Sequence, residues 1–227
     1  MADVMRVVHP VQLSPFAEVI DGRSSGIVVD IVRAAAERAG LRIDFLAVPF
    51  EQVEAALRDE RADIAIPIAV TSERRARFDF SDTLLMTGGS LFVRAGEATP
   101  DGLAALAGKV VVRPRTGPLA AYIAKVASDV KLVVTSDYEE SLRLLVGGEV
   151  DVAALNHQAG AMIAAKLHPG MLTFPREMFL ELPFGAAVLK GTRSETIAAL
   201  NAGLAAIEED GTFDGIILPR ALGRASP

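Results

Sequence analysis

Apolar and polar positions follow two periods along the chain, and the two periods take turns. Short runs rich in β-branched residues, such as Met5–Pro10 and Asp63–Ile68, are typical of strands. Longer runs with apolar residues three and four positions apart, such as Gly26–Gly40 and Phe50–Glu60, are typical of amphipathic helices. With Arg42–Val48 as a further strand, the order strand, helix, strand, helix, strand predicts a parallel sheet.

The same alternation begins anew after Gly88–Gly96, a strand that leaves the first set of elements. The strands and helices expected next are Lys109–Gly117, a helix from Pro118, Lys131–Thr135, Tyr138–Gly148, Val150–Leu155 and a helix from His157. Glu181–Gly191 predicts a return strand, and two amphipathic helices end the chain. We therefore expect a discontinuous first domain, residues 1–90 plus 187–227, with a second domain, residues 91–186, inserted in it.

Composition indicates a soluble, acidic globular protein. The 227 residues, 51% of them hydrophobic, suffice for one large or two small cores. Lys and Arg total 23 against 29 Asp and Glu, and the net charge of -6 argues against a nucleic-acid surface and a basic membrane face. The absence of cysteine excludes disulfides, thiol nucleophiles and thiolate metal sites.

The sequence has neither a membrane span nor an export signal. No apolar run approaches the roughly 18 to 20 residues that a span requires, and the first residues lack a basic region followed by an apolar one. We expect either a mature segment with an added initiator Met or a cytoplasmic protein.

The most distinctive candidate chemistry lies in Pro67–Asp82. An apolar strand runs into Thr71, Ser72 and Glu73, which are typical of a helix start because Thr or Ser can cap the first turn and Glu favours the helix dipole. Arg74 follows, and its guanidinium can form a bidentate pair with a carboxylate beyond the strand end. The residues alone leave open an anion site or an ordinary solvated charge cluster.

This run, with Asp79–Asp82 (DFSD) at its end, resembles the motif of the type 2 periplasmic solute-binding proteins, in particular the polar amino acid-binding family of ABC importers. The resemblance extends from Arg6 to Leu222 and includes the closing Asp-Gly-Thr-Phe of residues 210–213. It implies an α/β, two-lobed type II periplasmic-binding-protein-like fold. Each lobe would be a mostly parallel sheet flanked by helices, with hinge crossings near residues 88–93 and 183–188.

The resemblance implies a function as well as a fold. In the family, the Arg at the position of Arg74 binds the solute α-carboxylate, and the lobes close on the solute in the cleft between them. We therefore expect a periplasmic, monomeric solute-binding protein, with its signal peptide removed, that delivers a small anionic or zwitterionic solute to a membrane ABC permease. No cofactor, metal, nucleic acid or catalytic residue is expected, because the three histidines lack metal-ligand spacing and nucleophile and nucleotide motifs are absent.

Two alternatives stay open. One is a periplasmic enzyme on the same scaffold, resembling the cyclohexadienyl dehydratases, which would require an acid in the pocket; Glu18 and Glu181 are the best-placed candidates. The other is the ligand-sensing domain of a receptor.

Departures from the family's pattern bear on the solute. Asn156 stands where the family has the Asp that binds the solute ammonium, and an Asn side chain supplies no negative charge. Ala69 and Pro67 replace a hydroxyl residue and a small one. The solute is therefore expected to be amino acid-like or an amino acid derivative, with a carboxylate but without a strongly bound ammonium. Capping of the helix from His157 is the alternative role of Asn156.

The other predicted contacts have weaker support. Thr116 and Gly117 precede a helix whose backbone amides can bind an anion, and the resemblance assigns this turn to the solute carboxylate. Phe16 and Phe50 match the family's aromatic wall positions, and core packing is the alternative for both. Contact of His9 or His157 with the solute would make binding pH-sensitive, and ordinary hydrogen bonding is the alternative for both histidines. The full predicted ligand-binding set is Arg74, Thr116, Gly117, Asn156, Phe16, Phe50, Ala69, Pro67, Leu13, His9, Arg115 and His157.

Overall fold

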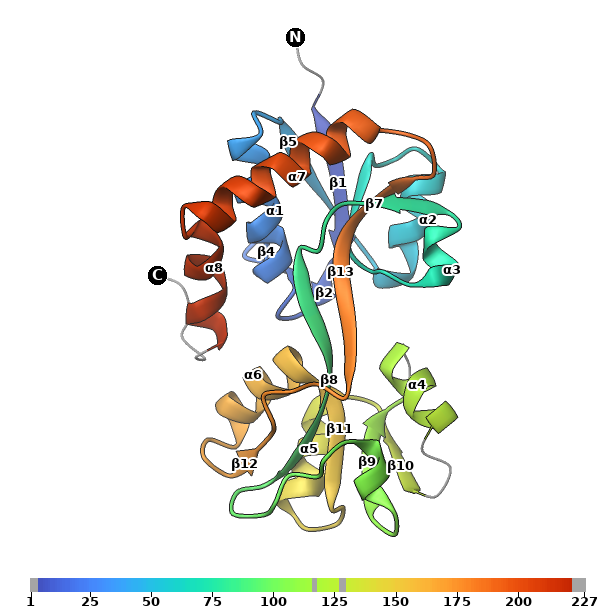
Figure 1. Ribbon diagram of the computed structural model, residues 1–227, viewed down its shortest axis with the longest axis vertical. Coiled ribbons are helices and arrows are strands. Elements are labelled where there is room, and N and C mark those ends of the chain that lie inside the picture. The colour runs from blue at the N-terminus through green and yellow to red at the C-terminus, as the bar shows by residue number, and fades with distance from the viewer. Residues whose placement is uncertain (1–3, 116–117, 127–129, 222–227) are drawn as a thin grey trace. The chain divides into compact units, whose positions relative to one another are not determined.

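The computed structural model describes residues 4–115, 118–126 and 130–221, and its chain divides into two compact units (Figure 1). Unit 1 comprises Met1–Met86 and Pro183–Pro227, and unit 2 is Thr87–Leu182. The chain passes from one unit to the other within β8 (Leu85–Arg94) and returns within β13 (Leu180–Leu189). The chain crosses between the units after Met86 and after Leu182, whereas the sequence predicted domain boundaries after residues 90 and 186.

Unit 1 is built on a mixed sheet that contains three parallel strands. The parallel strands are β1 (Met5–Pro10), β5 (Ile43–Val48) and β6 (Ile64–Ala69), each within a residue or two of its prediction. β13 pairs antiparallel with β6, and β7 (Phe78–Phe80) pairs antiparallel with β13. The strand order β13-β6-β1-β5 places β6, which leads to Arg74, inside the sheet.

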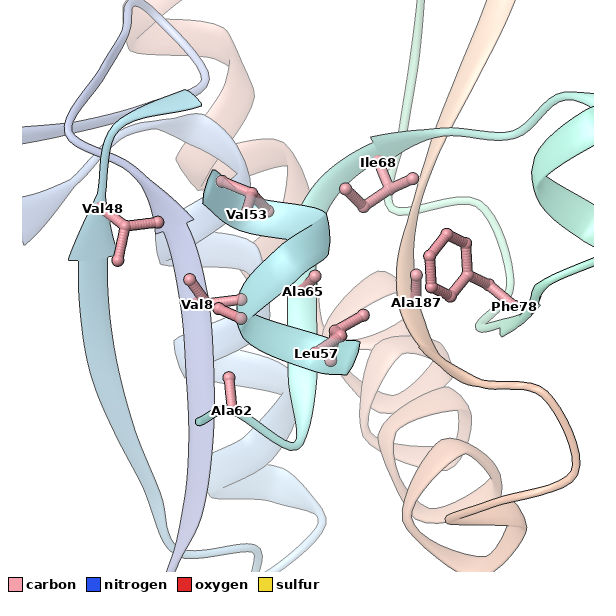
Figure 2. Close-up of a cluster of buried hydrophobic side chains, with 10 residues drawn as sticks. Val8, Val48, Val53, Leu57, Ala62, Ala65, Ile68, Phe78 and Ala187 are labelled. Atoms are coloured by element: carbon pink, nitrogen blue, oxygen red, sulfur yellow. The ribbon is translucent and has the colours of Figure 1, made fainter. Parts of the chain in front are cut away.

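Helices cover both faces of this sheet. The helices of unit 1 are α1 (Ile27–Arg38), α2 (Val53–Arg58, after the 3-10 turn η1, Phe50–Gln52), α3 (Ser72–Arg75), α7 (Ser194–Glu209) and α8 (Thr212–Ala221). Figure 2 shows α2 in front of the strands, where Val53 and Leu57 pack on Val8 of β1 and Ala65 of β6. Behind the strands lies α1, with α7 packed against it.

A small antiparallel sheet follows β1, and the sequence did not predict it. The strands are β2 (Gln12–Leu13), β3 (Ala17–Ile20) and β4 (Arg23–Ser25), in the order β2-β3-β4. Strands of two to four residues are too short to display a period, so their residues alone do not predict them.

Unit 2 repeats the α/β layering with four main strands in the order β10-β9-β11-β8. Its elements, besides β8, are η2 (Leu103–Leu106), β9 (Val110–Pro114), α4 (Pro118–Val126), β10 (Lys131–Thr135), α5 (Tyr138–Val146), β11 (Val152–Asn156), α6 (His157–Leu167) and β12 (Leu172–Thr173). β9 is parallel to β10 and β11, and β8 is antiparallel to β11. None of the helices within the described ranges is long and apolar enough to cross a membrane.

Two apolar clusters fill unit 2, one on each face of its sheet. Val152 and Ala154 of β11 pack in one cluster with Leu119 of α4, and Ala153 and Leu155 pack in the other with residues of α5 and α6. Successive side chains of a strand point to opposite faces. The sheet is therefore buried on both sides. Asn156 is the last residue of β11 and directly precedes α6.

Candidate functional site

Arg74 lies just beyond the end of β6, on a helix start that the sequence predicted. The hydroxyl of Thr71 accepts a hydrogen bond from the backbone N–H of Arg74 at 3.2 Å, which caps α3 and confirms this part of the prediction. The cap fixes the backbone of Arg74, and only about a fifth (21%) of its side chain is exposed.

The guanidinium of Arg74 is held by protein groups on two sides. Its Nε donates to Oε1 of Glu54 at 3.0 Å, and Nη2 lies 3.0 Å from the same oxygen. Nη1 donates to the backbone carbonyl of Ala69 at 3.2 Å. Glu54 was not predicted from the sequence, because this residue lies on α2, twenty positions before Arg74, and only the fold brings the two together.

Glu54 joins Arg74 to a second arginine. Its other oxygen, Oε2, lies 3.2 Å from Nη1 of Arg77. Arg77 in turn stands over the ring of Phe78 at 5.4 Å and lies 3.5 Å from a carboxylate oxygen of Glu73. One carboxylate between two guanidinium groups leaves this group of three side chains, Arg74, Glu54 and Arg77, with a net charge of +1.

Asn156 has two structural partners in unit 2. Its Oδ1 accepts a hydrogen bond from the backbone N–H of Ala159 at 3.1 Å, so it caps α6. Its Nδ2 donates to the hydroxyl of Thr87 at 2.7 Å, and that hydroxyl donates to Oε1 of Gln158 at 2.7 Å. The capping role is confirmed, and contact between Asn156 and a solute stays a prediction.

The two candidate histidines have their own partners. His9 is fully buried; its Nδ1 lies 2.8 Å from the carbonyl of Pro10 and therefore carries the hydrogen, while Nε2 accepts from the hydroxyl of Ser24 at 2.7 Å. Nδ1 of His157 lies 2.7 Å from the hydroxyl of the fully buried Ser90. Burial, the main cause in both cases, lowers the pKa of His9 and of His157 below the ordinary value of 6.5.

The apolar candidates divide between core and surface. Phe16 is 3% exposed and meets the ring of Phe184 edge-on at 5.1 Å, whereas Phe50 is 58% exposed on η1. Pro67 and Ala69 are buried in β6, and Leu13 is half-buried in β2. Solute contacts by these residues stay predictions.

The predicted anion-binding turn falls largely outside the described residues. Thr116 and Gly117 are not among them, and Arg115, directly before, is exposed. Of the acids considered for an enzyme, Glu18 accepts a hydrogen bond from Ser14 at 3.0 Å, and Glu181 is exposed. Within the described part of the chain, no three His, Asp or Glu side chains are grouped to hold a metal ion.

Comparison with known proteins identifies the family. Residues 5–218 match the profile of the bacterial extracellular solute-binding proteins, family 3. The chain belongs to this family. It is 26% identical over 220 residues to a probable histidine-binding protein of Neisseria gonorrhoeae, covering 94% of this chain and 81% of that one. It is 25% identical over 197 residues to a probable amino-acid ABC transporter-binding protein of Haemophilus influenzae, covering 86% and 75%.

Among solved structures, this solute-binding protein is similar to a histidine kinase sensor domain that itself resembles periplasmic binding proteins. The TM-score is 0.76 at 25% identity, and the match covers 100% of this chain and 99% of the other. The predicted family and fold class, α/β of the type II periplasmic-binding-protein kind, are thereby confirmed. The family is one of extracellular solute-binding proteins, and the Haemophilus influenzae relative is named as a probable amino-acid ABC transporter-binding protein.

Proposed function

We propose that this protein captures a small carboxylate-bearing solute for an ABC importer, with Arg74 as the carboxylate anchor. The observation that carries the proposal is the fixed guanidinium at the end of β6. Each terminal nitrogen of a guanidinium has two N–H groups. Nη1 and Nη2 of Arg74 make one contact each, so at least one N–H of each is unpaired among the described residues. Two such donors side by side suit the two oxygens of a carboxylate.

The solute is proposed to lack a strongly bound ammonium. Asn156 is neutral, its oxygen caps α6, and its amide nitrogen donates to Thr87. A capping oxygen that already accepts a backbone N–H is a weaker acceptor for an ammonium than a free carboxylate would be. A deaminated or N-substituted amino acid therefore fits these groups better than a free amino acid does.

The setting follows the family. We propose that the two units are lobes that close on the solute, that groups from both contact it, and that the closed monomer docks on a membrane permease in the periplasm. No reaction is proposed, since the relatives are named as binding proteins. A solute recovered chemically unchanged after prolonged incubation would support this, and a product that accumulates would favour an enzyme.

The test begins with a thermal-shift screen, because a solute that binds only the folded state raises the melting temperature. The panel holds the twenty L-amino acids, L-cystine, and for each amino acid its deaminated acid and its decarboxylated amine. For histidine these are 3-(imidazol-4-yl)propionate and histamine. We expect the best binders among compounds with a carboxylate, the deaminated acids first, and none among the amines.

Calorimetry on variants then tests the anchor. Arg74→Ala removes charge-assisted hydrogen bonds of about 1.5–3 kcal/mol each, so affinity should fall at least about a hundredfold. Arg38→Ala is the matched control, because Arg38 also pairs with a carboxylate in unit 1, and it should bind like the wild type. Retention of wild-type affinity by a folded Arg74→Ala protein would refute the assignment.

The similarity to a histidine kinase sensor domain favours a second candidate, the ligand-sensing part of a receptor. Solute binding alone does not separate the two roles. Solute-dependent stimulation of ATP hydrolysis by a permease reconstituted in liposomes would support the importer. Solute-dependent autophosphorylation of a kinase that carries this chain would support the receptor.

A further inference from the structure

We propose that Glu54 is a positioning residue, which holds the guanidinium of Arg74 in the orientation that receives a solute carboxylate. This inference rests on the proposed function of Arg74. A carboxylate beside the anchor has another possible role, because it can occupy the guanidinium and compete with the solute. The contacts in unit 1 favour positioning over competition.

The first reason is the edge of the guanidinium that Glu54 uses. A single oxygen, Oε1, contacts Nε and Nη2 at 3.0 Å each, which is the side edge of the group. A competing carboxylate would place its two oxygens on the two terminal nitrogens. Nη1 is instead 3.2 Å from the carbonyl of Ala69 and contacts no carboxylate among the described residues. The terminal nitrogens therefore keep N–H groups for a second carboxylate.

The second reason is that Glu54 is itself held in place. Its Oε2 lies 3.2 Å from Nη1 of Arg77, so turning its Oε1 toward the terminal edge of Arg74 would break that contact. Three restraints thus act on Arg74: the Thr71 cap on its backbone, the Ala69 carbonyl on Nη1, and Glu54 on Nε. A long side chain that is fixed before binding loses less conformational entropy when the solute arrives.

The third reason is the local charge. With Glu54 ionised between Arg74 and Arg77, these three side chains keep a net charge of +1, and the Glu73 carboxylate beside Arg77 is 87% exposed, so solvent screens most of its charge. An anionic solute is therefore still attracted, although one of the two positive charges is neutralised. Glu54 orients the anchor without cancelling it.

One experiment needs no solute. The Nε–H signals of arginines can be observed by NMR, and we would measure the rate at which the Nε–H of Arg74, assigned by its loss in Arg74→Lys, exchanges with water. Slow exchange is expected in the wild type and in Glu54→Gln, whose amide oxygen still accepts from Nε. Fast exchange is expected in Glu54→Ala. Equal rates in all three proteins would overturn the proposal, whatever the protein binds.

Calorimetry with the panel compounds that bind the wild type gives the second readout. Loss of one immobilising contact should weaken carboxylate binding about three- to tenfold in Glu54→Ala. Glu54→Gln should restore affinity to within about threefold of the wild type. The matched control is Asp210→Ala, because Oδ2 of Asp210 also pairs with Nε and Nη2 of an arginine in unit 1, Arg38. It should leave affinity unchanged.

The outcomes separate this inference from the proposed function. If Glu54→Ala and Glu54→Gln both bind more tightly than the wild type, Glu54 is a competitor and the inference is wrong while the anchor stands. If both bind like the wild type, Glu54 has no role in binding. If no panel compound binds the wild type, the proposed solute class is wrong, and the exchange rate of Arg74 alone decides whether Glu54 holds it.

Discussion

Asn156 offers the sharpest test of how one residue combines a structural and a proposed functional role. Its oxygen caps α6 through Ala159, and its amide nitrogen donates to the fully buried Thr87. Substitutions at this position can remove the two contacts together or one at a time. Asn156→Ala removes both, Asn156→Ser keeps a capping oxygen but is too short to reach Thr87, and Asn156→Asp keeps the cap but cannot donate.

The magnitudes follow from these contacts. Loss of a cap costs about 1 kcal/mol, and loss of the hydrogen bond to Thr87 costs about 1 kcal/mol more, so Asn156→Ala should lose about 2 kcal/mol of unfolding free energy. Asn156→Ser should lose about 1 kcal/mol. In Asn156→Asp the carboxylate gains about 0.3–1 kcal/mol from the helix dipole, which offsets most of the lost donation. The melting temperature of Asn156→Ala should fall by about 4–8 °C.

Thermal and urea unfolding without solute, monitored by circular dichroism, rank the stabilities of the three variants. Hydrogen exchange of the Ala159 amide shows whether the loss of stability arises at the start of α6. The amide should lose protection in Asn156→Ala and keep it in the Ser and Asp variants. Asp137→Ala is the control in the same unit, because Asp137 caps α5 through Glu140 at 2.8 Å. A folded Asn156→Ala protein with the wild-type melting temperature, or an Asp variant as unstable as the Ala variant, would refute the reasoning.

The Asp variant also tests the proposed solute. It restores the negative charge that the family's pattern has at this position, so amino acids should gain affinity relative to their deaminated acids. Asp137→Ala should leave the preference unchanged, which separates the effect of charge from that of stability. Tight binding of an ordinary amino acid by the wild type, with the ammonium essential, would contradict the proposal.

Two further predictions concern stability alone. Burial lowers the folded-state pKa of His9, so the contribution of neutral His9 to stability is complete above pH 6.5. This contribution is lost as the pH falls from 6.5 toward the folded-state pKa, at up to about 1.4 kcal/mol per pH unit. Between pH 7.5 and 5.5, urea unfolding should show a smaller loss of unfolding free energy in His9→Asn than in the wild type, and an equal loss would exclude His9 as a cause. Gly203→Ala in α7 would place a Cβ 2.0 Å from the carbonyl oxygen of Ala35 in α1 and should lower the unfolding free energy, measured by calorimetry, by about 1–3 kcal/mol. The control is Gly215→Ala in α8, whose added Cβ would have nothing within 4 Å and which should be neutral or stabilising. A stabilised Gly203→Ala protein would contradict the close packing of α1 and α7.

Most of the architecture was predictable from the sequence because its elements are long enough to display a period. β1, β9 and α1 lie where the apolar spacing predicted them, and Thr71 caps α3 as its side-chain chemistry indicated. The strands β2 to β4 were missed because pairing between neighbours, such as Gln12 with Glu18, stabilises them rather than their own pattern.

The site was less predictable than the fold. Arg74 and Asn156 could be proposed from the sequence because local motifs mark them, at a strand end and a helix start. Glu54 was missed because nothing near it in the sequence distinguishes it from an ordinary solvated acid on an amphipathic helix. Its contact with Arg74 forms only where α2 and α3 meet, and a pattern within a short stretch of sequence carries no information about such a pairing.

The two polar groups with proposed roles point to the same class of solute. A zwitterionic amino acid requires a positive group for its carboxylate and a negative one for its ammonium. The first is present, because Arg74 with Glu54 and Arg77 keeps a net charge of +1. The second is absent at Asn156, whose side chain is neutral and occupied by α6 and Thr87. Charge balance therefore favours a solute with a net negative charge, and adding a positive charge to the solute should weaken binding.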